Sequence, residues 1–157
     1  YTEPDPRDDL SGMDVARKAL ILARLIGSRL ELSDIAVHGL VPEALKQCSI
    51  EEFMAKLPVR AGELDRLVAD AAERGNTMRY LATVTPRAVR VGLEEVPSQS
   101  PFGALDGPEN LFVIRSKRYQ TTPLQIRGPG AGAEVTAAGV LADALRVGKT
   151  ISITAKV

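Results

Sequence analysis

A nearly continuous apolar run between Ser11 and Gly27 limits the folds open to this chain. Ser11 and Asp14 have the S-x-x-D spacing of a capping box, and Gly27 is a typical helix stop. The run therefore predicts a helix from Ser11 or Gly12 to about Ile26. Its apolar residues fall on almost every side of that helix, namely Val15, Ala16, Ala19, Leu20, Ile21, Leu22, Ala23, Leu25 and Ile26. Such a helix has no face suited to water, so we expect it to be a buried central helix.

The sequence on either side of this helix predicts a mixture of short elements. Residues 1–10, which contain two prolines and four acids, favour an extended or turn-rich segment. The next elements expected are a strand at 34–41, a helix that Ser49 caps and that ends at Leu57, and a helix at 62–74.

From Met78 onward the apolar period becomes two, which predicts β-structure. We expect a hairpin with strands at 78–84 and 89–94, then strands at 111–118 and 123–127. A glycine loop at 128–132 leads to a helix at 133–145 and a polar-alternating tail at 150–156. This order of elements predicts an α+β fold, with a mostly antiparallel sheet of about five strands and helices packed on one face.

Composition limits the partners of the chain. Twenty basic residues balance twenty acidic ones, so charge favours neither nucleic acid nor a membrane surface, and we expect a small-molecule substrate. Cys48 and His38 are the only residues of their types, which excludes an internal disulfide and argues against a Cys/His metal site. No apolar run of about 18 residues and no signal peptide occur, so we expect a cytoplasmic protein.

Charged residues gather in the first eighteen positions, at Glu3, Asp5, Asp8, Asp9, Asp14 and Lys18. Asp14 and Lys18 are four residues apart, so they share one face of the predicted helix. A lysine on a buried face needs a partner, and nearby carboxylates give it the tunable pKa that acid–base chemistry requires. The alternative is a solvated i,i+4 ion pair, with Asp14 serving only as the capping-box carboxylate, which from spacing alone is the commoner arrangement.

The string from Tyr1 to Lys18, YTEPDPRDDLSGMDVARK, resembles the signature segment of homoserine dehydrogenases, both the stand-alone enzymes and those fused to aspartokinase. The likeness continues after the 62–74 helix, in Arg118-Tyr119, and in the stretch 128–139. It implies that residues 1–147 form the catalytic, substrate-binding and dimerisation domain, with the N-terminal NAD(P)-binding domain missing. The tail at 148–157 matches nothing in the family and its role is open.

The resemblance also implies a role for individual residues. Lys18 matches the catalytic proton donor and acceptor at the substrate oxygen, and Asp14 matches a substrate-binding carboxylate beside it. Glu3 matches the acid that binds the amino group of homoserine, with Asp9 and Tyr1 also near the substrate. Gly132 matches a glycine that contacts the nicotinamide nucleotide.

The activity that the resemblance implies is the interconversion of L-homoserine and L-aspartate 4-semialdehyde by hydride transfer with NAD(P), on the route to threonine and methionine. We expect the isolated chain to be inactive and to form a homodimer through its sheet, in the cytoplasm or, in a plant, in the plastid. The alternative is a non-catalytic oligomerisation or scaffold module that has kept the fold.

The glycine loop itself does not predict an independent dinucleotide-binding fold. Gly128, Gly130 and Gly132 lack the G-x-G-x-x-G spacing, and Pro129 interrupts them. The start of the following helix could present backbone N–H groups to an anion, or the loop could be a plain tight turn, and spacing alone leaves both open.

Overall fold

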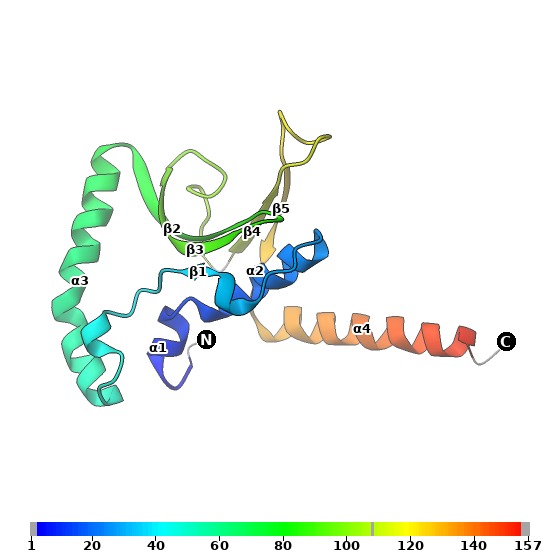
Figure 1. The fold of residues 1–157 in the computed structure, drawn as a ribbon, viewed down its shortest axis with the longest axis horizontal. Coiled ribbons are helices and arrows are strands. Elements are labelled where there is room, and N and C mark those ends of the chain that lie inside the picture. The colour runs from blue at the N-terminus through cyan, green and yellow to red at the C-terminus, as the bar shows by residue number, and fades with distance from the viewer. Residues whose placement is uncertain (1–2, 108, 155–157) are drawn as a thin grey trace. The chain divides into compact units, whose positions relative to one another are not determined.

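The computed structural model describes residues 3–107 and 109–154 and divides into two compact units, Tyr1–Gly103 and Ala104–Val157 (Figure 1). The first unit contains α1 (Pro6–Leu10), α2 (Met13–Leu25), the 3₁₀ turn η1 (Leu32–Asp34), β1 (Ala36–Val37), the 3₁₀ turn η2 (Glu43–Leu45), α3 (Ile50–Glu73), β2 (Asn76–Val84) and β3 (Val89–Pro97). The second contains β4 (Glu109–Ile114), β5 (Leu124–Pro129) and α4 (Ala133–Thr154). The mixed helix and strand content agrees with the predicted class.

A three-stranded sheet in the order β1-β3-β2 forms the centre of the first unit. β2 and β3 pair antiparallel from Asn76 opposite Pro97 to Val84 opposite Val89, which confirms the predicted hairpin. β1 pairs parallel with β3 through only Ala36 and Val37, so the longer strand expected at 34–41 is wrong. Residues 32–34 form η1 instead, in which the Asp34 carboxylate accepts the Glu31 N–H at 2.8 Å.

The core of the first unit lies between α2 and this sheet. Ala16 and Ala23 on α2 have no exposed surface, and neither has Val91 on β3, because the small alanines let the helix approach the strand closely. The opposite side of α2 is open, with Ile21 61% and Leu25 77% exposed. The expectation that this helix is buried all round is therefore wrong within the described residues, since only one of its faces is covered.

The chain begins with a short helix where we expected an extended or turn-rich segment. Asp5 caps α1 by accepting the backbone N–H of Arg7 at 3.0 Å, and Pro6 occupies the first helical position, which needs no N–H. The next helix, α2, begins at Met13 after Gly12. Ser11, which we expected as its N-cap, accepts the Met13 N–H through its hydroxyl at 3.2 Å.

Two predicted helices are one in the structure. Ser49 caps α3 as predicted, since its side chain accepts the Glu52 N–H at 3.1 Å. The helix then continues through Pro58 and Gly62 to Glu73, so the expected break after Leu57 is wrong. Proline removes one backbone hydrogen bond, but good helix formers on both sides allow the helix to continue.

The second unit has a two-stranded antiparallel sheet, β4 with β5, which confirms that two strands form there, although β4 ends at Ile114 and not at Arg118 as we expected. The strands in the described part of the chain thus form sheets of three and two strands. The single sheet of about five is not observed there, because β4 and β5 pair with each other. α4 continues to Thr154, so the alternating tail expected from Thr150 is wrong over its described part. No helix among the described residues is both long enough and apolar enough to span a membrane.

Candidate active site

The predicted site residues of the first unit lie on α1, on α2 or just before them. The backbone N–H of Glu3 donates to Oδ2 of Asp9 at 2.9 Å, and Nζ of Lys18 lies 2.8 Å from Oδ2 of Asp14. The structure thus makes two pairs, and among the described residues no hydrogen bond or ion pair joins one pair to the other. Tyr1, the remaining predicted substrate contact in this unit, lies outside the described residues.

A tight turn between α1 and α2 sets the relation between the two pairs. Gly12 has φ +76°, and a Cβ there would overlap the hydroxyl oxygen of Tyr80 on β2, so this position requires glycine. The Ser11 hydroxyl donates to the carbonyl of Asp8 at 2.8 Å and so ties the end of α1 to the turn. Asp9 and Asp14 are therefore held on two short helices joined at a fixed angle.

Contacts from strand β2 and from the loop after β1 hold this turn in place. The Leu40 N–H donates to the Leu10 carbonyl at 2.8 Å, and a Cβ on Gly39 would lie 2.7 Å from the Ser11 carbonyl oxygen. The Tyr80 hydroxyl donates to the His38 carbonyl at 3.1 Å, and burial raises the pKa of Tyr80, so it remains a neutral donor. The sequence did not predict a role for Gly39, because that role depends on its contact with Ser11, which is distant in sequence.

The Asp14–Lys18 pair is open to solvent in this chain. The two side chains are 66% and 67% exposed, so the expected lysine on a buried face is not observed. The reason is the helical spacing, because the buried residues of α2 lie on the side opposite Asp14 and Lys18. The same outward side continues into Ile21 and Leu25, so the ion pair stands at one end of an exposed apolar stripe.

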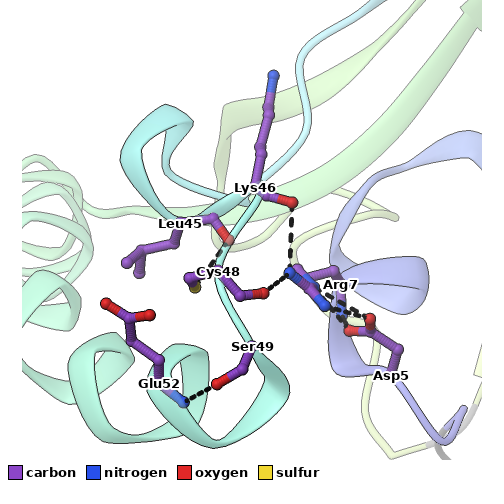
Figure 2. A network of polar contacts seen from close by, with 7 residues as sticks. All are labelled: Asp5, Arg7, Leu45, Lys46, Cys48, Ser49 and Glu52. Carbon is purple, nitrogen blue, oxygen red and sulfur yellow. Dashed lines mark hydrogen bonds and ion pairs between the residues drawn. The ribbon is translucent and has the colours of Figure 1, made fainter.

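Arg7 is the principal residue that sequence reasoning missed (Figure 2). Its Nε and Nη2 donate to both carboxylate oxygens of Asp5, at 2.6–3.0 Å, and its Nη1 donates to the carbonyls of Cys48 at 2.7 Å and Lys46 at 3.3 Å. The hydrogen bonds from Arg7 lower the pKa of the Asp5 carboxyl and keep it ionised. Asp-Pro at a helix start does signal an N-cap, but the partner carbonyls lie about forty residues away and leave no local signal.

Gly132, the predicted nucleotide contact, lies in the second unit just before α4. Its φ is +125°, and its carbonyl accepts the Thr136 N–H at 3.1 Å, as expected for a helix N-cap position. Among the described residues other than its chain neighbours, none has an atom within 4 Å of where a Cβ on Gly132 would stand. Gly130 differs, because a Cβ there would overlap the side-chain amide of Asn110, so packing explains that glycine.

Comparison with known proteins gives consistent matches. The family model for homoserine dehydrogenase matches residues 1–145. The bifunctional aspartokinase/homoserine dehydrogenase 2, chloroplastic, of Zea mays is 51% identical over 150 residues, covering 94% of this chain and 16% of the maize protein. The homoserine dehydrogenase of Schizosaccharomyces pombe is 44% identical over 151 residues, covering 94% of this chain and 40% of that protein.

Solved structures agree with the sequence matches. A Candida auris protein of unknown function superposes with a TM-score of 0.87 at 42% identity, over 95% of this chain and 42% of that one. Homoserine dehydrogenase from S. aureus shares the fold, with a TM-score of 0.67 at 18% identity, over 96% of this chain and 34% of that one. The chain thus shares its fold with part of each of these longer proteins. Because the family model covers nearly the whole sequence, the chain belongs to the homoserine dehydrogenase family.

Proposed function

We propose that this chain is the catalytic, substrate-binding part of an oxidoreductase that interconverts L-homoserine and L-aspartate 4-semialdehyde with NAD(P), on the route to threonine and methionine. The observation that carries the proposal is the 2.8 Å contact between Lys18 and Asp14, on the helix that directly follows the Glu3–Asp9 pair. Both pairs lie within the region that matches the family.

The proposed chemistry uses opposite charges on the substrate. The ammonium of homoserine binds the carboxylates of Glu3 and Asp9, because carboxylates give charge-assisted hydrogen bonds to a cation. Lys18 donates a proton to the substrate oxygen in reduction and accepts it in oxidation, while Asp14 orients the lysine. Uptake and release of this proton require a partner that excludes bulk water from a lysine that is 67% exposed in this chain.

We propose that the backbone at Gly132 contacts the nicotinamide nucleotide. The open space beside this glycine lets a ligand approach the main chain. The glycine loop lacks a dinucleotide-binding fingerprint, so we propose that a separate nucleotide-binding domain holds most of the nucleotide. When bound, the nicotinamide supplies or accepts the hydride.

The chain spans 16% of the maize relative and 40% of the S. pombe relative, and we propose that it acts as part of a longer enzyme. We expect this longer enzyme to be a homodimer through the face of the sheet away from α2. On that face Arg90 is 61% exposed and pairs with Glu94 at 2.7 Å. Light scattering on wild type and on Arg90→Glu tests this interface, and a wild-type monomer would contradict it.

A chimera tests the activity. In it this chain replaces the matching segment of the S. pombe homoserine dehydrogenase, which supplies the remainder of that protein. We expect homoserine-dependent reduction of NAD(P) by the chimera and none by the 157-residue chain alone. Turnover by the chain alone would refute the proposed division of labour, and a folded chimera with no turnover would refute the proposed function and favour a non-catalytic module.

A further inference from the structure

Arg7 connects two parts of the first unit that are far apart in sequence. It lies on α1, within the acidic segment of residues 3–9, and its Nη1 donates to the carbonyls of Lys46 and Cys48 in the turn before α3 (Figure 2). The opposite side of the same guanidinium grips Asp5 through three hydrogen bonds. One side chain therefore fixes the start of α1 and also docks α1 on the turn before α3.

The surroundings of Arg7 are those of a packed residue. Its side chain is 19% exposed, and its guanidinium carbon lies 5.7 Å from the ring centroid of Phe53, which has no exposed surface. A cation over a buried aromatic ring gains from the ring quadrupole. A planar guanidinium also suits this position, because one edge can bind a carboxylate with two donors while another donor reaches a carbonyl.

The position of Glu3 and Asp9 depends on how α1 is held. α1 has five residues, and a helix this short is not stable without tertiary contacts. Asp9 lies on it, and the Glu3 backbone is bound to Asp9. Among the described residues, contacts at both ends dock α1 on the rest of the unit: the Leu10–Leu40 hydrogen bond at the end near α2, and the contacts of Arg7 at the end near Glu3.

We propose that Arg7 is a positioning residue that holds Glu3 and Asp9 where they bind the ammonium of the substrate, an inference that rests on the proposed function. Arg7 does not touch the substrate and takes no part in proton transfer. Arg7 therefore affects the binding of the substrate ammonium, which contributes equally in the ground state and the transition state. Loss of such an interaction raises KM more than it lowers kcat.

The test is Arg7→Gln in the chimera, with Arg24→Gln as the matched control. Arg24 also pairs with an acid of the same unit, Glu31, at 2.7 Å, away from the acidic segment. We expect Arg7→Gln to raise the KM for homoserine about tenfold, with kcat and the KM for NAD(P) near wild type. Loss of a positive charge next to acids would, by electrostatics alone, favour a cationic group, so the direction of the change identifies positioning.

Arg7→Lys supplies the conservative comparison. It keeps a cation against Asp5, and we expect its KM to lie between those of wild type and Arg7→Gln. A KM for Arg7→Gln equal to that of Arg24→Gln would overturn the proposal. So would a fall in kcat as large as the rise in KM, or a lysine variant no better than the glutamine variant.

A measurement on the 157-residue chain separates this proposal from the proposed function. We expect backbone order parameters of residues 3–10 to fall from about 0.85 toward 0.6 in Arg7→Gln and to stay unchanged in Arg24→Gln. Unchanged values in Arg7→Gln would overturn the docking role of Arg7 whether or not the chimera turns over homoserine. An inactive wild-type chimera whose order parameters change as expected would instead refute only the proposed function.

Discussion

The two units of the chain bury their apolar residues to very different extents. In the first, Ala16, Ala23, Phe53 and Val91 have no exposed surface, and α2 packs on a three-stranded sheet. In the second, none of the described side chains is buried. Its helix α4 exposes apolar residues between positions 135 and 151, among them Val140, Leu141, Leu145, Val147 and Ile151.

This difference in burial means that the two units differ in how far their own contacts stabilise them. The first unit has a core that can stabilise it, so its site segment on α1 and α2 is held by the unit's own contacts. In the second unit, strand pairing and the ion pair of Glu109 with Arg127 are local interactions, and local interactions alone give marginal stability. The first unit should therefore respond to substitutions in its core, while the second should respond little to changes on α4.

The largest effect that we expect comes from a residue that the core of the first unit does not use. Lys18→Ala in the chimera should lower kcat about 10²–10⁴-fold, the usual contribution of a positioned proton donor. The side chain is 67% exposed, so the free energy of unfolding should stay near wild type. Urea unfolding of the same variant provides the control. A kcat within about threefold of wild type would show that Lys18 does not transfer the proton.

The second prediction compares two leucines on opposite sides of α2. Leu20 is 8% exposed and Leu25 is 77% exposed. In the 157-residue chain, Leu20→Ala should lower the free energy of unfolding by about 2–4 kcal/mol through lost burial and a cavity, and Leu25→Ala should change it by less than about 0.5 kcal/mol. Urea denaturation measures both. Equal losses would show that the outward side of α2 is covered in solution.

Local signals in the sequence predicted much of the first unit's structure. The change to period two at Met78 predicted the hairpin, and Ser49 predicted the start of α3. The apolar run predicted α2 itself, but it could not show that only the side with Ala16 and Ala23 is covered. Burial depends on what packs against a helix, and that partner is not encoded in the helix's own pattern. The predicted helix end at Leu57 was wrong, since the surrounding turns override the single unfavourable residue Pro58.

The roles of the candidate site residues stay predictions, while the structure gives their contacts. Family likeness singled out Glu3, Asp9, Asp14 and Lys18, and the structure arranges them as two pairs. Spacing alone predicted the Asp14–Lys18 contact, because residues four apart share a helix face. Arg7 was missed because its carbonyl partners are distant in sequence. Long-range contacts of this kind come from the fold of the backbone and have no composition or spacing that reveals them.

The third prediction compares a glutamate–arginine ion pair in the first unit with one in the second. Arg74 and Asn76 lower the pKa of Glu95 in the first unit from 4.5 to about 2, through hydrogen bonds of 2.7–2.9 Å. A carboxyl with a lowered folded-state pKa stabilises the protein fully above its unfolded pKa, and this contribution disappears as the pH falls through its folded-state pKa. Between pH 4.5 and about 2, Glu95→Gln should therefore flatten the decline of the melting temperature. Parallel curves for wild type and variant would contradict this.

Glu109 provides the matched variant in the second unit. A hydrogen bond with Arg127 lowers its pKa as well, so the sign of the effect is the same. Because this pair lies in a unit with no buried side chain among its described residues, Glu109→Gln should change the main unfolding transition less than Glu95→Gln does. The reverse order would show that the second unit contributes more to the cooperative fold than its burial indicates.

The smallest effect that we expect is on α4. Leu141 is 60% exposed, and in the 157-residue chain Leu141→Ala should change the free energy of unfolding by less than about 0.5 kcal/mol, because there is little buried area to lose. Leu20→Ala, which has the same chemical change at a buried position, is the comparison. A loss at Leu141 as large as that at Leu20 would mean that α4 packs in solution against an apolar surface. The contrast between a first unit stabilised by its own core and a second unit stabilised only by local interactions would then no longer hold.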